Sequence, residues 1–229
     1  MFMFYKKSPA SPGRLQAARW GLWHAGMALI FGALMLATSA ATATAAGTRQ
    51  YTAAAGGSLV INGTSTLHDW TAKTTALTGN AVFSGKWTGR SKAALKLQSI
   101  NLVIAVKSIK SSEGGGMDDT MYSALDLKHH ALITYELIKA HLLTRPTNAT
   151  AAAVFNTTGA LRVAGVTKTV SLVLTATPTP GGGLSITTKI KLKMTLFGVT
   201  PPTAMFGVIR SGNAITITTI WPLAVKAGA

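Results

Sequence analysis

The chain of 229 residues contains no cysteine and only six Asp and Glu residues. The absence of cysteine excludes disulfide bonds, thiolate zinc sites, iron–sulfur clusters and thiol catalysis. Charged residues make up 12% of the chain, about half the share of roughly 25% in ordinary soluble proteins. Gly-x-Ser-x-Gly, phosphate-loop and His-Glu-x-x-His motifs are also missing. With so few carboxylates, a binding protein is favoured over an enzyme.

The N-terminal region has the pattern of a secretory signal peptide. Residues 1–20 carry four basic residues and no acid, Leu22 to Leu36 is mostly apolar, and small residues fill 40–46. We therefore expect residues 1–46 to be a cleaved signal peptide, with the cut near Ala45 or Ala46, and a periplasmic or secreted mature protein. The alternative is an uncleaved anchor, because Gly21 to Ala37 approaches the ~17-residue lower limit of a spanning helix.

The chain is strongly basic, with 22 Lys and Arg residues and a formal charge of +16. On an exported protein, such a charge predicts attraction to an anionic envelope surface, either polymers or lipid headgroups. Nucleic acid is not an expected partner, because export separates the two and no basic helix or aromatic stacking platform occurs. The sequence predicts no oligomeric state.

Alternating apolar and polar residues predict β-strands over most of residues 47–229. Ile190, Leu192 and Met194 alternate with a row of lysines, Lys189, Lys191 and Lys193. The same alternation places Val170, Leu172 and Leu174 on one face, and Ile100, Leu102, Ile104 and Val106 on another. Leu95 and Leu97 have the opposite parity, which predicts a bulge near Gln98–Ser99.

These strands and their turns predict an all-β fold. Further strands are expected near 58–62, 66–76, 81–87, 131–137, 158–163 and 214–221, with Gly, Asn and Pro residues between them. Seven or eight short strands joined by tight connections favour a closed antiparallel barrel or a sandwich. Residues 47–229 therefore form a single domain.

One segment has helical spacing. Met117, Met121 and Leu125 recur every four residues after three glycines, and Asp118 and Asp119 suit the positive end of a helix dipole. We predict a short amphipathic helix across one end of the barrel. It is either a lid that closes the core or a surface that contacts a ligand.

Four motifs in order resemble the YceI-like, polyisoprenoid-binding family. They are Gly63-Thr-Ser-Thr-Leu-His-Asp-Trp70, Met117-Asp-Asp119 with Ala124-Leu125, Gly159-Ala-Leu-Arg-Val-Ala-Gly-Val-Thr-Lys168, and Leu196-Phe-Gly198. The resemblance covers roughly residues 50–225. It implies an eight-stranded, lipocalin-like antiparallel barrel in the periplasm that holds an isoprenoid chain. The chain departs from the family at His129-His130-Ala131, where Tyr-Pro is common, and at Pro201-Pro202.

This resemblance and the apolar faces together predict a non-catalytic carrier of an isoprenoid lipid, such as a quinone or a polyprenyl phosphate. No other cofactor is expected, and the alternating strands place no polar group deep inside. A filled, dry barrel in a cationic structural or adhesive envelope protein is the alternative. The predicted ligand-binding residues are Ile100, Leu102, Ile104, Val106, Met117, Met121, Leu125, Val170, Leu172, Leu174, Ile190, Leu192, Met194, Phe197 and Phe206.

The histidines offer weaker candidates for chemistry. His68 and Asp69 are adjacent, but neighbours on a strand point to opposite faces, so a structural role near the barrel end is favoured over acid–base catalysis. His129 and His130 would also diverge on an extended chain, and no standard metal spacing adds a third ligand. We therefore predict no metal site and no catalytic residue.

Cleavage of the first 46 residues is testable. We expect the exported protein to begin close to residue 47, because the small residues at 40–46 suit a signal-peptide cut. N-terminal sequencing of the protein recovered outside the cytoplasm measures this directly. An intact Met1 on the exported chain would contradict cleavage and support the anchor.

Overall fold

The computed structural model describes residues 47–88 and 94–226, so the predicted signal peptide lies outside the described residues. Within this part of the chain the elements are β1 (Arg49–Ala53), β2 (Ser58–Ser65), β3 (Trp70–Thr74), β4 (Leu77–Ser84), β5 (Lys96–Ala105), β6 (Lys110–Ser111), α1 (Gly115–Ala124), β7 (Leu132–Thr144), β8 (Ala153–Val163), β9 (Val166–Pro178), β10 (Leu184–Lys193), β11 (Thr203–Ala204) and β12 (Ile209–Val225). Short 3₁₀ segments cover Val106–Ser108, Pro180–Gly182, Met194–Phe197 and Met205–Gly207.

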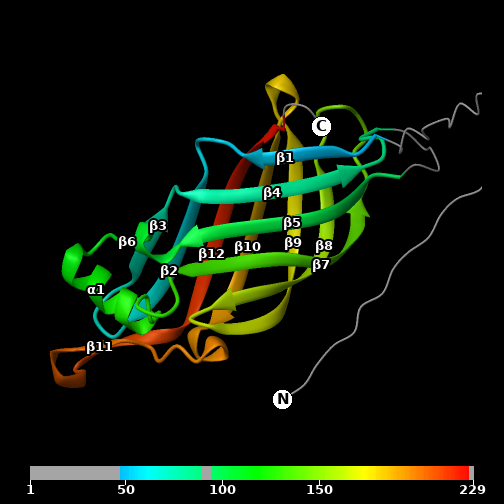
Figure 1. Ribbon diagram of the computed structural model, residues 1–229. Coiled ribbons are helices and arrows are strands. Elements are labelled where there is room, and N and C mark those ends of the chain that lie inside the picture. Colours follow the sequence, from blue (N-terminus) through cyan, green and yellow to red (C-terminus); the bar gives the residue numbers. More distant parts are fainter. Residues whose placement is uncertain (1–46, 89–93, 227–229) are drawn as a thin grey trace, which may run out of the picture. The chain divides into compact units, whose positions relative to one another are not determined.

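Eight strands form a closed antiparallel barrel, in the order β1-β4-β5-β7-β8-β9-β10-β12, with β12 pairing back to β1 (Figure 1). The ring closes where Tyr51 pairs with Val225 and Ala53 with Leu223. The prediction of an eight-stranded antiparallel barrel with one short helix is confirmed. The strand β1, which the sequence analysis did not predict, is the strand that completes the ring.

The long strand β12 pairs with β10 along one edge, and its other edge pairs with β1 and with β2 in succession. Its C-terminal residues pair with β1, whereas Ser211 to Ile220 pair with β2, and β3 and β6 extend the sheet beyond β2. The helix α1 follows β6 directly and contacts it. Figure 1 shows α1 and β11 at the same end of the barrel, with the β9–β10 turn at the other end. We call these the α1 end and the far end.

The predicted bulge in β5 is confirmed. Val82 pairs with Ser99 and Phe83 with Leu97, so Gln98 is an extra residue on its strand. Because a bulge reverses the parity of the residues that follow, Leu97 and Ile100 both face the interior. This reversal keeps the apolar residues of the whole strand on one side of the barrel wall.

Several strands differ from their predicted bounds. The predicted strand 66–76 begins only at Trp70, because residues 66–69 form a turn in which Ser65 Oγ accepts hydrogen bonds from the amides of Leu67 and His68. β7 and β8 are longer than predicted, since they pair with each other as far as Thr144 and Val154. Long-range pairing thus extends strands whose ends carry no clear alternation.

A substitution at Gly79 tests how closely β4 approaches β5. Its φ of +128° is unfavourable for other residues, and an added Cβ would meet the backbone oxygen of Asn101. We expect Gly79→Ala to lower the free energy of unfolding by about 1–3 kcal/mol in chemical denaturation.

The matched control is Gly116→Ala, because Gly116 lies in α1 with no atom within 4 Å of its added Cβ. This variant should be neutral or gain up to about 1 kcal/mol, since alanine favours a helix over glycine. Equal effects of the two substitutions would contradict the close approach of β4 and β5.

Candidate functional site: an apolar cavity in the barrel

A cavity of about 200 Å³ lies inside the barrel at the α1 end. Holding one water molecule takes only about 10–15 Å³ on this measure, so the cavity is an order of magnitude larger than a single water site. Its wall is formed by the inward faces of β2, β3, β5, β7, β8, β9, β10 and β12, together with α1. Nearly all of the wall is aliphatic or aromatic side chains, which is typical of a site for an apolar ligand.

Twelve of the fifteen predicted ligand-binding residues line this cavity. They come from three strands, from α1 and from the turn after β10, and they are Ile100, Leu102, Ile104, Met117, Met121, Leu125, Leu172, Leu174, Ile190, Leu192, Met194 and Phe197. Residues distant in sequence therefore meet around one space. Whether they contact a lipid remains a prediction.

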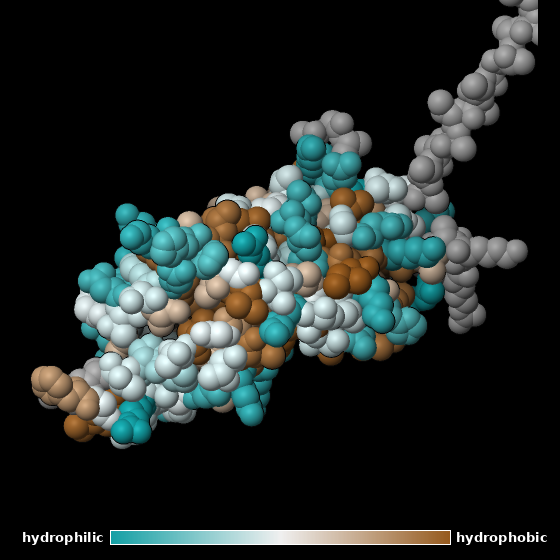
Figure 2. Space-filling model, turned by 60° about the horizontal axis from the view of Figure 1, so that its bottom comes forward, coloured by the Kyte–Doolittle hydropathy of each residue, from teal (hydrophilic) through white to brown (hydrophobic). Residues whose placement is uncertain are grey.

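The other three predicted residues lie outside the wall. Val106 is buried in the 3₁₀ turn after β5, and Val170 is buried in the packed core. Phe206 lies in the turn after β11 with its side chain fully exposed, beside the exposed Val208. This turn projects from the molecule with a hydrophobic surface (Figure 2).

The far half of the barrel is filled by its own side chains. Phe83 packs edge-on against Tyr51 and Phe155, with ring centroids 5.8 and 6.0 Å apart, and Trp87 lies 6.3 Å away. Tyr51, Phe83 and Phe155 are almost fully buried, and none of them lines the cavity. We call Tyr51, Phe83 and Phe155 the aromatic plug. The cavity therefore ends within the barrel instead of passing through it.

The helix α1 places its apolar face over the α1 end of the cavity. Met117, Met121 and Leu125 all line the wall, as the four-residue spacing predicted. Methionine side chains adapt to irregular shapes, which suits a surface that meets a flexible ligand.

A buried carboxylate attaches α1 to β6. Asp118 Oδ1 accepts a hydrogen bond from the Ser111 amide N–H at 2.6 Å, and Asp118 Oδ2 lies 3.0 Å from Lys110 Nζ. The Ser111 amide and the Lys110 ammonium both favour the ionised form, so they hold the pKa of Asp118 below its ordinary value of 3.8. The Tyr122 hydroxyl adds a hydrogen bond of 2.8 Å to the Ile109 carbonyl. These contacts fix the helix at the cavity end.

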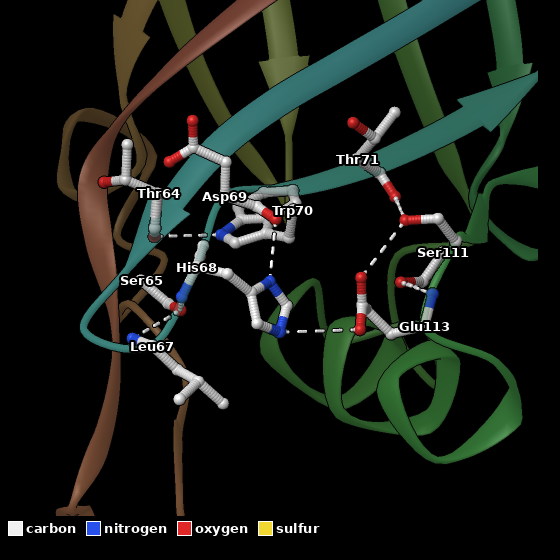
Figure 3. Close-up of polar contacts among 10 residues, drawn as sticks. Thr64, Ser65, Leu67, His68, Asp69, Trp70, Thr71, Ser111 and Glu113 are labelled. Atoms are coloured by element: carbon white, nitrogen blue, oxygen red, sulfur yellow. Dashed lines mark hydrogen bonds and ion pairs between the residues drawn. The ribbon is translucent and has the colours of Figure 1, made fainter.

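The Gly63–Trp70 motif positions one wall residue. The Trp70 indole lies over Gly63, where an added Cβ would collide with the ring. Its Nε1 donates to the Thr64 carbonyl at 3.0 Å (Figure 3). Glycine is therefore required opposite Trp70 for the ring to reach the cavity wall.

His68 and Asp69 do not form an acid–base pair. The His68 Nδ1 lies 2.8 Å from the Asp69 backbone oxygen, and its Nε2 lies 3.7 Å from a Glu113 carboxylate oxygen. In Figure 3 the Asp69 carboxylate and the His68 ring point in different directions. His68 thus links the β2–β3 turn to the loop before α1.

His129 and His130 converge, contrary to the expectation that they diverge. Their rings lie 2.7 and 3.7 Å from the two carboxylate oxygens of Asp126, because residues 126–129 form a turn and not a strand. Within the described residues, no cluster of three or more His, Cys, Asp or Glu side chains could hold a metal ion.

The expectation of an interior without polar groups is wrong. Thr188 and Thr219 are directly paired across β10 and β12, and both line the cavity, as does Trp221 two residues further along β12. Trp221 Nε1 is buried and has no hydrogen-bond partner among the described residues. An unpaired buried donor costs about 1–3 kcal/mol. The alternation of Ile215, Ile217, Thr219 and Trp221 could have identified these residues from the sequence.

Tyr135 adds a hydroxyl to the opposite wall of the cavity. It lies 3.3 Å from Thr157 Oγ1, and burial raises the pKa of the Tyr135 phenol above its ordinary value. The phenol is therefore neutral at physiological pH.

The three lysines of β10 are exposed on the outside of the barrel, and Lys193 also reaches the cavity wall at the α1 end.

None of the described helices is long and apolar enough to cross a membrane.

Comparison with known families identifies the fold. The family model described as YceI-like domain matches residues 58–219. The chain belongs to the YceI-like family. The resemblance drawn from the four motifs is thereby confirmed, and the YceI-like match includes most of the cavity wall.

Solved structures show the same YceI-like architecture. One is a polyisoprenoid binding domain from Saccharophagus degradans implicated in plant cell wall breakdown, with a TM-score of 0.58 at 12% identity, covering 79% of this chain and 100% of that one. Another is BcnA from Burkholderia cenocepacia, with a TM-score of 0.53 at 16% identity, covering 72% of this chain and 95% of that one. At these identities the likeness shows the fold alone. A comparison with curated proteins found no match.

The attachment of α1 should depend on the charge of Asp118. Because the folded pKa lies below 3.8, the ionised contacts are complete above that pH and are lost as the pH falls through the lower folded pKa. We expect Asp118→Asn at neutral pH to raise hydrogen exchange at the Ser111 amide severalfold, because the neutral side chain accepts a weaker hydrogen bond. In the unaltered protein, acidification should lower the protection of this amide relative to its intrinsic exchange rate at the same pH.

Asp119→Asn is the matched control, since Asp119 is the adjacent residue and is exposed. It should leave exchange at Ser111 unchanged. Similar exchange rates in both variants, measured by NMR, would show that the Asp118 contact does not hold the helix.

Proposed function

We propose that this YceI-like protein is an exported, non-catalytic carrier that holds the chain of an isoprenoid lipid, such as a quinone or a polyprenyl phosphate, inside its barrel. The observation that carries the proposal is the cavity of about 200 Å³ with an almost wholly apolar wall. Removing apolar surface from water gains about 25 cal/mol per Å², so a hydrocarbon chain favours such a space.

The shape of the site supports a chain-like ligand. The aromatic plug closes the far half, and α1 covers the other end with methionines, so a ligand is held along the wall between them. A branched, flexible chain can follow a wall of Ile, Leu and Met side chains without needing polar partners along its length. The Saccharophagus degradans neighbour is described as polyisoprenoid-binding, which supports the same ligand class here.

Export is supported by the basic and apolar pattern of residues 1–46. Binding without chemistry is supported by the separation of His68 from the Asp69 carboxylate and by the apolar wall. The alternative, a cationic structural or adhesive envelope protein with a filled barrel, has less support because only the far half is filled. The exposed lysines Lys189, Lys191 and Lys193 remain a surface that suits anionic envelope components in either case.

Blocking the cavity tests the carrier. Leu172 lines the wall on β9, and its neighbour Ser171 is exposed on the outside of the same strand. We expect Leu172→Trp to lose most of the lipid that co-purifies with the unaltered protein, because the larger ring occupies the space of the chain. Native mass spectrometry and lipid extraction after gentle purification measure the bound lipid.

Ser171→Trp is the matched control and should retain its lipid, because the added ring faces solvent. Circular dichroism confirms that both variants are folded. Equal lipid content in the two variants, or repeated recovery of the unaltered protein without lipid, would contradict the proposed function.

A further inference from the structure

Trp221 carries a hydrogen-bond donor that the protein itself does not use. The two other tryptophans in the described part of the chain donate to backbone carbonyls, Trp70 to Thr64 at 3.0 Å and Trp87 to Ala151 at 2.9 Å. Trp221 is only 2% exposed, yet its Nε1 is the one buried side-chain nitrogen or oxygen without a partner in the described part of the chain. Buried polar groups are normally paired, so this exception points to a partner from outside the chain.

Two hydroxyls lie on the same part of the wall. Thr219 precedes Trp221 by two residues on β12, so both side chains face the cavity, and Thr188 is the cross-strand partner of Thr219 on β10. Thr188 Oγ1 donates its proton to the Val173 carbonyl at 2.8 Å, so it can accept a further hydrogen bond but has no proton left to donate to a ligand. We call Thr188, Thr219 and Trp221 the inner polar group.

The inner polar group lies far from the α1 end. Ser211, which lines the cavity next to α1 and Pro202, is ten residues before Trp221 on β12. The pairing of β12 is irregular between Ser211 and Ile215, and the six regular residues from Ile215 to Trp221 alone correspond to roughly 20 Å of strand at about 3.3 Å per residue. Ile186, the cross-strand partner of Trp221, lines the wall at the same level. A ligand atom that meets Trp221 is therefore the innermost part of the ligand.

The charges on the cavity wall indicate which kind of ligand atom can lie beside Trp221. Lys193 is the one charged side chain among the described residues of the wall, and it lies at the α1 end. A phosphate beside Trp221 would be a buried anion without a counter-charge, which is strongly unfavourable. A neutral carbonyl oxygen suits an indole N–H, because it accepts a hydrogen bond and carries no net charge.

Resting on the proposed function, we propose that Trp221 and Thr219 form an inner subsite, in which the indole N–H and the threonine hydroxyl donate to a neutral carbonyl-type oxygen of the lipid. The lipid then enters with its oxygen-bearing group first, and its isoprenoid tail runs back toward Met117 and Met121 on α1. A lipid whose only polar group is a phosphate does not satisfy this subsite.

The indole proton of Trp221 reports on the subsite directly. The probes are ubiquinone-2, a benzoquinone with a short isoprenoid tail, and squalene, an isoprenoid hydrocarbon without oxygen. In ¹⁵N–¹H NMR spectra of the full-length chain, Trp221→Phe assigns the Trp221 indole signal. We expect ubiquinone-2 to move this signal downfield, whereas squalene leaves it close to its ligand-free position.

Affinities provide the second measurement. Trp221→Phe keeps an aromatic ring and removes the donor, so we expect it to weaken binding of ubiquinone-2 about threefold to tenfold, the worth of one hydrogen bond. Squalene binding should not change. Thr219→Val should weaken ubiquinone-2 binding in the same direction, whereas Thr218→Val, at the neighbouring outward-facing position of β12, should not.

The outcomes separate this inference from the proposed function. If squalene binds and neither the indole signal nor the Trp221→Phe affinity distinguishes the two probes, the inner subsite is contradicted and the carrier stands. An equal loss of both probes in Trp221→Phe would show that the ring acts by shape alone, which also overturns the subsite. If the unaltered protein binds no isoprenoid, the proposed function itself fails.

Discussion

The unequal filling of the barrel interior is the constraint on which the rest of the structure depends. Eight strands enclose a space that side chains can fill completely or leave partly open. Here Tyr51, Phe83 and Phe155 fill the far half, whereas aliphatic side chains line the other half and do not meet across it. Because the aromatic plug supplies a packed core, the α1 half can keep a cavity without the fold losing its interior contacts. The placement of aromatic side chains in the far half and aliphatic ones in the α1 half therefore produces both the cavity and its closed end.

The remaining features follow from this division. The open half needs a cover, and α1 supplies it with an apolar face attached through Asp118 to the Ser111 amide. The boundary between the filled and open halves lies near Trp221, where polar side chains interrupt an apolar wall. A carrier built this way can select its ligand at two places, by chain shape along the wall and by hydrogen bonding at the inner end. Lys189 and Lys191 of β10 are exposed outside the barrel and contribute to neither.

Local patterns predicted much of this molecule. The bulge at Gln98, the helix with Met117 and Met121, and the inward face of Ile190 follow from periodicity within a few residues, which the sequence displays directly. Features that depend on distant pairing were missed. β1 is short and became a strand by pairing with two partners, and the polar character of Thr219 concealed its inward position. The size and the closed end of the cavity depend on how all strands meet, so no single segment predicts them.

A crystal structure of the protein purified gently from the cells that make it tests the central claim most directly. The account predicts continuous non-protein electron density along the barrel axis, running from the methionines of α1 to Trp221 and ending at the aromatic plug. A barrel whose α1 half is closed by its own side chains, with no tunnel wide enough for a methyl-branched hydrocarbon, would contradict it. The YceI-like fold would survive that result, and the carrier function would not.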